Sequence, residues 1–267
     1  MSYETLFIKL WNDYVSRNPH VSTIHQLFIN HGETVINDHI ALRTFNDPRV
    51  NIEHLAKPFL RYGYQEKGQY NFPIKKLFAK HYEHPNPESP KVFISELLLQ
   101  DCSSSLQSIA EECINKIPPD LLDTEELLTS GSLWQPLSYK TYQTLLEESE
   151  YAAWMYAFGF CANHFTVDVN KLKNWHTIQE VNQFLEQHDV KLNSSGGLIK
   201  GTPQECLEQS STLAGDIDVK FIEGVYRIPS CYYEFAKRYP LPNGNLYTGF
   251  IAASADKIFE STDVGAR

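Results

Sequence analysis

The chain has 267 residues, of which 42% are hydrophobic and 13% aromatic, a composition typical of a folded globular protein. Its formal net charge is −10 and Lys and Arg do not cluster, so the phosphates of a nucleic acid would not be neutralised and we expect no nucleic-acid partner. Because no run approaches the ~20 apolar residues of a membrane span, we also expect no membrane insertion.

The cysteines and the first residues indicate a compartment. The stretch MSYETLFIKLWNDY has no basic segment followed by an apolar one, so we expect no signal peptide. The five cysteines are widely spaced and form no C-x-x-C pair. We interpret such a pattern as reduced, mostly buried thiols. Because reduced thiols are typical of the cytoplasm, we expect a cytoplasmic protein.

The N-terminal region is predicted to be helical. Apolar residues recur at helical spacing over residues 3–16, and a second helix over 21–30 ends near Gly32. We therefore expect a helical N-terminus over residues 3–31.

A β-rich half follows over residues 35–102. Its first strand is VINDHIALRTF, residues 35–45, in which polar side chains interrupt an apolar run. The segment NIEHLAKPFLRYGY predicts a helix up to Gly63, kinked or interrupted at Pro58. Two β-rich runs then follow, IKKLFAKHYEH and KVFISELLLQ, and each half of the chain includes a strand with a lone Glu, here Glu96.

A mostly helical connector over residues 103–148 leads to a second β-rich half over 160–253. The order of elements repeats there, with the strand FCANHFTVDV (160–169), the helix TIQEVNQFLEQHD (177–189) and the β-rich segments GGLIKG, GDIDVKF, GVYRIPSCYYEFAKR and NLYTGF. We predict a single α+β domain over residues 1–267, in which two β-rich halves pair their sheets around one shared cavity.

Lone polar residues stand on these otherwise apolar strands. Because alternate side chains share a face, His39 and Arg43 point to one side of their strand and Asp38 to the other. A buried polar group without a partner costs ~1–3 kcal/mol, so His39, His164 and Glu234 could be partners through a metal ion. Two imidazoles and one carboxylate form the facial triad that holds non-haem Fe(II), and Zn(II), Mn(II) or Ni(II) could use the same donors.

Each of these residues also has a purely structural interpretation. A single strand histidine is often a hydrogen-bonded core or surface residue. Arg43 could pair with a core carboxylate such as Asp38 or Asp168, and Glu234 could lie on an exposed edge strand. Near the C-terminus, AASADKIFES predicts a helix that starts at Ser254, where amide groups could bind a substrate carboxylate or simply cap the helix.

Four stretches, NDHIALRTF, ANHFTVDV, CYYEFAKRYP and LYTGFIAASADKIFEST, together resemble the 2-oxoadipate dioxygenase/decarboxylase family. The resemblance runs over about residues 3–261. It implies a vicinal oxygen chelate-like fold and an Fe(II) enzyme that converts 2-oxoadipate, with O₂, to 2-hydroxyglutarate and CO₂. It also implies that His39, His164 and Glu234 are the metal ligands and that Arg43 binds the substrate as a catalytic residue.

Two other functions stay open at this point. A vicinal-oxygen-chelate-type lyase or isomerase would use the same ligands to polarise a small carbonyl substrate without O₂. A non-catalytic metal-binding protein would need only the ligands. Because the better-known bacterial members of the family are longer, the metal ligands carry over to this chain more directly than the substrate does. The sequence leaves the oligomeric state open.

Overall fold

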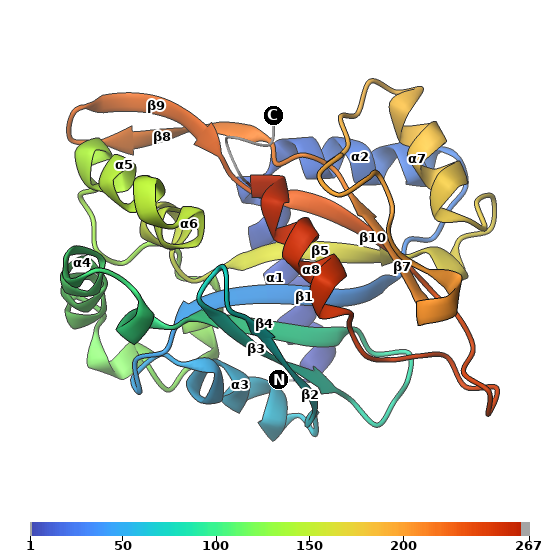
Figure 1. Cartoon of the computed structure of the whole chain (residues 1–267), viewed down its shortest axis with the longest axis horizontal. Coiled ribbons are helices and arrows are strands. Elements are labelled where there is room, and N and C mark those ends of the chain that lie inside the picture. Colours follow the sequence, from blue (N-terminus) through green and yellow to red (C-terminus); the bar gives the residue numbers. More distant parts are fainter. Residues whose placement is uncertain (1, 263–267) are drawn as a thin grey trace. The chain divides into compact units, whose positions relative to one another are not determined.

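The computed structural model describes residues 2–262, and Figure 1 shows its elements in chain order. Residues 1 and 263–267, which the predicted domain includes, lie outside the described part. The chain divides into two compact units. The first unit contains the described residues up to Tyr14, 41–163 and 216–230. The second unit contains 15–40, 164–215 and the described residues from Cys231 onward.

The first unit is built on strands in the order β2-β3-β4-β1, of which β2, β3 and β4 pair antiparallel. The bounds of these strands are Gln65–Phe72 for β2, Leu77–Glu83 for β3, Lys91–Leu97 for β4 and Asn37–Phe45 for β1, whose first residues belong to the second unit. Phe7 of helix α1 (Tyr3–Arg17) lies 6.1 Å from Phe59 of helix α3 (Ile52–Arg61), measured between ring centroids. Buried aromatic side chains therefore fix these two helices to each other.

The remaining elements of the first unit are helices and one hairpin. They are α4 (Ser104–Asn115), α5 (Tyr139–Glu148), α6 (Glu150–Phe158), the 3₁₀ turns η1 (Leu99–Asp101), η2 (Pro119–Leu121) and η3 (Glu125–Thr129), and the strands β8 (Asp216–Phe221) and β9 (Gly224–Pro229). Every residue of α6 after Glu150 is buried, so this helix is a core element of its unit. The ring of Tyr139 stacks on that of Tyr226 at 3.6 Å, which fixes the β8–β9 hairpin beside α5.

The second unit contains the strand order β5-β10-β7-β6, with the first residues of β1 completing it. Strand β10 runs parallel to β5 and antiparallel to β7, and β7 pairs antiparallel with β6. The strands span Ala162–Asp168 (β5), Lys200–Thr202 (β6), Leu207–Ser211 (β7) and Tyr232–Arg238 (β10). The helices span Pro19–Asn30 (α2), Ile178–Glu186 (α7) and Ala252–Phe259 (α8), with the 3₁₀ turns η4 (Val169–Lys171), η5 (Pro203–Glu205) and η6 (Glu260–Thr262).

The two faces of the β10 region are covered differently. On one face, Phe28 of α2 lies 5.7 Å from Phe235 of β10 and 5.2 Å from Phe184 of α7. On the other face, Tyr232 packs in a buried cluster with Ile258 of α8. Because neighbouring strand residues point to opposite sides, Glu234 shares the α8 face with Tyr232 and is shielded from the aromatic cluster around Phe235.

The predicted α+β class is confirmed, and the predicted strands and helices match observed elements with some exceptions. Strands β2 and β7 and helix α6 were not predicted. Strand β2, QEKGQYNF, is mostly polar and exposed, and β7, LEQSS, is buried yet polar, so neither shows an apolar alternation. Helix α3 runs through Pro58. The described part of the chain contains no helix long and apolar enough to cross a membrane.

Two predictions near the C-terminus are wrong. NLYTGF, residues 245–250, forms no strand beyond a single bridge between Leu246 and Pro240. The carbonyls of Tyr247 and Gly249 instead accept hydrogen bonds from the Arg238 side chain. Helix α8 begins at Ala252 and not at Ser254, and its cap residue Ile251 has no side chain that could bond the first amides.

Candidate metal centre

Three strands bring the predicted ligands together. In the parallel pair of β5 and β10, His164 stands opposite Tyr232 and Thr166 stands opposite Glu234. His164 and Glu234 therefore project from the same face of the sheet. His39 comes from the first part of β1, which lies in the same compact unit.

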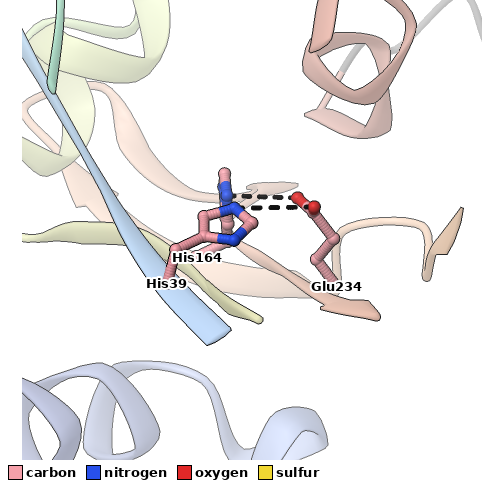
Figure 2. A group of neighbouring side chains, drawn as sticks. All are labelled: His39, His164 and Glu234. Atoms are coloured by element: carbon pink, nitrogen blue, oxygen red, sulfur yellow. Dashed lines mark ion pairs between the residues drawn. The ribbon is translucent and has the colours of Figure 1, made fainter. Parts of the chain in front are cut away.

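The donor atoms of these side chains converge, as Figure 2 shows. Nε2 of His164 lies 3.1 Å from one carboxylate oxygen of Glu234, and Nε2 of His39 lies 3.5 Å from the other. The two imidazole rings stand almost perpendicular, with centroids 5.5 Å apart. Among residues 2–262, this is the only group of three or more His, Cys, Asp or Glu side chains with ligand atoms within 4.8 Å of one another.

The group fits a single divalent metal ion. Two donors about 2.1 Å from one ion and at roughly a right angle are ~3 Å apart, which agrees with the two separations to Glu234. All three residues are buried, with at most 4% of their surface exposed. Burial raises the pKa of Glu234 to about 8, although the positive charges of Arg238 and Lys200 act in the opposite direction. A bound dication would favour the ionised carboxylate.

Several neighbours hold the ligands in place. Gln209 Nε2 donates a hydrogen bond of 2.6 Å to Glu234 Oε1. Thr166 Oγ1 lies 3.0 Å from His39 Nε2, the atom that a metal ion would bind, so a bound ion would replace this contact. Tyr232 stacks on the His164 ring with centroids 4.7 Å apart. The sequence gives a weak signal for these roles, because Gln209 lies on a polar strand without apolar alternation and bonds Glu234, a residue 25 positions away along the chain.

Asp38 departs from the predicted alternation. The strand pattern places Asp38 and His39 on opposite faces, yet the Asp38 carboxylate bends back and lies 2.8 Å from His39 Nδ1. The reason is Arg238, whose guanidinium binds both oxygens of Asp38 and holds the carboxylate at that position. Arg238 is the last residue of β10.

A buried lysine adds positive charge to this region. The Lys200 side chain is 3% exposed and donates a 2.5 Å hydrogen bond to the carbonyl of Asn193. Burial lowers the pKa of Lys200 to about 8, while the negative charge of Glu234 acts in the opposite direction. Lys200 was not predicted, because a single lysine on a short strand carries no recognisable pattern.

Arg43 lies in the first unit, where its guanidinium is enclosed. The residue is 1% exposed, and its Cζ lies 4.8 Å from the ring of Tyr151 and 4.9 Å from that of Trp154. Nη1 is 3.3 Å from a carboxylate oxygen of Glu150, a partner that was not foreseen, since Asp38 and Asp168 were the expected carboxylates. Two aromatic faces and one carboxylate make a rigid setting for a planar cation.

Ser254, the remaining candidate, and Glu96, the lone strand glutamate of the first half, both have structural contacts. Ser254 is buried in the first turn of α8, and Gly201 lies so close that a Cβ at that glycine would be 3.3 Å from Ser254 Oγ. Glu96 on β4 accepts a 2.9 Å hydrogen bond from the backbone N–H of Ile52, the first residue of α3. Glu96 therefore caps a helix, which accounts for a lone carboxylate on that strand.

Known proteins resemble the chain over most of its length. The sequence profile of the 2-oxoadipate dioxygenase/decarboxylase family matches residues 6–246. The chloroplastic 2-oxoadipate dioxygenase/decarboxylase of Arabidopsis thaliana is 37% identical, over 93% of this chain and 74% of its own length. The crystal structure of hydroxyglutarate synthase from Oryza sativa, in complex with 2-oxoadipate, is 34% identical with a TM-score of 0.92, and the match covers 99% of this chain and 93% of that one.

A solved structure from Shewanella frigidimarina, provisionally named a hydrolase, is 51% identical with a TM-score of 0.88, over 94% of this chain and 98% of that one. A protein of Ralstonia eutropha, provisionally assigned to the glyoxalase superfamily, matches at a TM-score of 0.75 and 20% identity, over 92% of this chain and 85% of that one. The last likeness concerns the fold alone and confirms the expected vicinal oxygen chelate-like fold. By the profile match and the plant relatives, the chain belongs to the 2-oxoadipate dioxygenase/decarboxylase family.

Proposed function

We propose that the chain is a metal-dependent 2-oxoadipate dioxygenase/decarboxylase whose metal ion is held by His39, His164 and Glu234. The observation that carries this proposal is the convergence of those three buried donors, in a chain that belongs to this family. The native ion in the proposal is Fe(II), because two imidazoles and one carboxylate leave coordination positions open for a 2-oxo acid and O₂.

The proposed reaction balances in atoms. One 2-oxoadipate and one O₂ give one 2-hydroxyglutarate and one CO₂. C1 leaves as CO₂, one oxygen atom of O₂ converts the C2 carbonyl into a carboxylate, and the other becomes the hydroxyl group on C3. The substrate is its own reductant, and no second 2-oxo acid is consumed. Bound Fe(II) would activate O₂, with the net electrons coming from the substrate, and would provide a Lewis-acid contact for the 2-oxo acid.

The protein's own side chains would bind and orient. We assign to Arg43 the binding of a substrate carboxylate, because a planar guanidinium can bind a carboxylate through two parallel hydrogen bonds. Its enclosure between Tyr151 and Trp154 supports that assignment, since a cation that is already ordered loses little entropy on binding. The first amides of α8 around Ser254 are the proposed contact for the second carboxylate.

An oxygen-consumption experiment tests the activity. Protein loaded with Fe(II) under anaerobic conditions is mixed with 2-oxoadipate in an oxygen electrode cell, and CO₂ and 2-hydroxyglutarate are quantified. Equal amounts of O₂ consumed, CO₂ released and 2-hydroxyglutarate formed are expected. Turnover of the 2-oxo acid without O₂ uptake would replace the proposal with the lyase or isomerase alternative, and metal binding without any turnover would leave a metal-binding protein.

The identity of the metal is tested separately. Aliquots of metal-free protein receive Fe(II), Zn(II), Mn(II) or Ni(II), and each is assayed for metal content and for O₂ uptake with 2-oxoadipate. We expect all four ions to bind, because the nitrogen and oxygen donors are common to them, and Fe(II) to support O₂ uptake. Equal O₂ uptake with Zn(II), which has no accessible redox state, would contradict the assignment of iron.

We also propose a reducing compartment such as the cytoplasm. All five cysteines are free thiols, and only Cys206 is partly exposed. The names of the two plant relatives place those relatives in the chloroplast, or in the chloroplast or amyloplast. Fractionation of cells that produce the protein at its native level, followed by immunoblotting, tests the compartment, and recovery of the protein in organelles would contradict it.

A further inference from the structure

A buried ion pair lies directly behind one of the proposed metal ligands. Arg238 Nε donates to Asp38 Oδ1 over 2.6 Å, and Arg238 Nη2 donates to Asp38 Oδ2 over 2.9 Å. The same Oδ2 lies 2.8 Å from His39 Nδ1. We propose that Asp38 and Arg238 are positioning residues, which fix the tautomer and the ring orientation of His39 so that Nε2 presents its lone pair to the metal ion. This inference rests on the proposed metal centre.

The tautomer follows from the hydrogen-bond partners. An ionised carboxylate only accepts hydrogen bonds, so a neutral His39 must carry its proton on Nδ1 to bond Asp38. Nε2 is then an acceptor, and Thr166 Oγ1, 3.0 Å away, can donate its hydroxyl proton to it. With the opposite tautomer, Nδ1 and the carboxylate would be two acceptors facing each other at 2.8 Å, which is repulsive. Asp38 therefore selects the form of His39 that can bind a metal through Nε2.

Arg238 is held on all sides, which makes it a firm support for Asp38. Besides the two bonds to Asp38, Nη1 donates to the carbonyls of Tyr247 and Gly249 at 3.0 and 2.8 Å. The backbone N–H and carbonyl of Arg238 bond the side chain of Asn170, at 2.8 and 2.9 Å. A planar guanidinium with this many partners has one orientation, so both oxygens of Asp38 are fixed as well.

Phe250 completes the arrangement. Its ring stands perpendicular to that of His39, with centroids 4.8 Å apart, and lies 5.2 Å from Arg238 Cζ. The backbone just before Phe250 is the part bound by the guanidinium. Arg238 therefore constrains His39 twice, through Asp38 at Nδ1 and through Phe250, whose ring packs against the imidazole.

The alternative is that the pair merely stabilises the fold. Burying two charges costs several kcal/mol per ion before their attraction is counted, and a pair of this kind is weak evidence for stability in itself. The two possibilities differ in what they predict for the folded protein. A structural pair would change the melting temperature and leave the metal affinity of the folded protein unchanged.

Asp38→Asn tests the inference, because Asn has the same shape but its amide can also donate to Nδ1 and so favours the wrong tautomer. Zn(II) affinity is measured by competition calorimetry on the full chain, with a melting curve for each variant. We expect Asp38→Asn to weaken Zn(II) binding ~10–100-fold, the range for outer-shell partners of metal ligands. Glu208→Gln is the matched control, since Glu208 is a buried carboxylate of β7 that bonds Tyr239. Its Zn(II) affinity should equal that of the wild type.

Nitrogen NMR of metal-free, ¹⁵N-histidine-labelled protein gives a readout independent of metal binding. The signals of His39 are assigned by their loss in His39→Gln. In the wild type we expect neutral His39 to carry its proton on Nδ1. In Asp38→Asn we expect a larger population with the proton on Nε2. Two results would overturn the inference. One is a Zn(II) affinity of Asp38→Asn equal to that of the wild type, and the other is a neutral His39 in the wild-type protein that carries its proton on Nε2.

The same experiment separates this inference from the proposed function. A wild-type chain that does not bind Zn(II) would contradict the metal centre, while the NMR readout would still test the tautomer. Should Asp38→Asn not fold, Arg238→Lys is measured in the same two ways. This variant keeps the positive charge but loses the planar guanidinium that bonds both oxygens of Asp38, so we expect weaker Zn(II) binding. Wild-type affinity in that variant would equally overturn the inference.

Discussion

Glu234 is the only acidic member of the candidate ligand group, and its environment suits a bound cation better than a free carboxylate. Burial raises its pKa to about 8, with the neighbouring Asp38 charge acting in the same direction. A carboxylate in such a place is unfavourable when ionised without a cation nearby, since desolvation penalises the charged form. A metal ion would reverse that preference.

Glu234→Gln keeps the shape of the side chain and removes the charge that a metal ligand needs. We expect the variant to fold and its Zn(II) affinity to fall by more than the ~10–100-fold typical of an outer-shell change. Calorimetric titration of both proteins measures the difference. The matched control is Glu96→Gln, since Glu96 is also a lone strand glutamate but caps α3. Equal losses in the two variants would contradict the assignment of Glu234 as a ligand.

Arg43→Lys keeps the positive charge and loses the planar fork. If Arg43 binds the distal carboxylate of 2-oxoadipate, loss of a charge-assisted hydrogen bond of ~1.5–3 kcal/mol should lower kcat/KM roughly ten- to hundred-fold. The control substrate is 2-oxohexanoate, which has the same chain length and lacks the distal carboxylate. Steady-state kinetics on both substrates should show a poor reaction with 2-oxohexanoate that changes little in the variant.

The Arg43 prediction has an explicit contrary outcome. Arg43 also contacts Glu150, Tyr151 and Trp154, so a packing role is conceivable. In that case Arg43→Lys and Arg43→Ala would lower the melting temperature and reduce kcat/KM for both substrates alike. Metal affinity should be unchanged in either case, because Arg43 is not among the candidate ligands.

At the scale of elements, a hairpin and a helix are joined by one carboxylate. Glu223 lies between β8 and β9 and accepts hydrogen bonds from the backbone N–H groups of Tyr139 and Lys140 and from Ser138 Oγ. These donors form the N-terminus of α5, where a negative charge is favourable. The hydrogen bond from Tyr139 is the largest of the effects that lower the pKa of Glu223 to about 2, from an ordinary value of 4.5.

The Glu223 contact predicts a pH dependence of stability. Since the folded pKa lies below the unfolded one, the unfolded chain binds more protons between about pH 2 and 4.5, and stability rises with pH in that window. The contribution is complete above about pH 4.5 and lost as pH falls towards 2. Urea unfolding at several pH values should give a shallower dependence for Glu223→Gln. Glu186→Gln, at an exposed position on α7, should retain the wild-type slope, and identical slopes in all three proteins would contradict the assignment.

At the scale of the whole chain, the three candidate ligands belong to one of the two compact units. A ligand that binds only the folded state stabilises it by ~2.7 kcal/mol at a hundredfold excess over Kd. We expect Zn(II) to slow hydrogen exchange most in the strands that bear the ligands, residues 164–168 and 232–238. Exchange in β3, residues 77–83 of the other unit, should slow less. Equal slowing in both units would show that the chain opens as one cooperative unit.

The sequence by itself determined the ligand candidates, the fold class and the family. His39, His164 and Glu234 stand out because a strand buried on one face rarely carries a lone ionisable group, so its presence indicates a specific partner. Helices with a clear apolar stripe, such as α1 and α7, were predicted for a similar reason, since their local pattern reflects which face is buried. The predicted halves at 35–102 and 160–253 stay a prediction.

Only the tertiary structure decided how the ligands are supported. Asp38 and Arg238 are 200 residues apart along the chain, and Gln209 and Glu234 are 25 apart. Hydrogen bonds between distant side chains leave no periodic trace in the sequence, because any polar residue can make them once strand pairing brings it close. For the same reason, local pattern could not assign two segments. One is β7, a buried strand of polar residues, and the other is the segment 245–250, whose carbonyls bind a guanidinium. Their conformations depend on partners that the fold supplies.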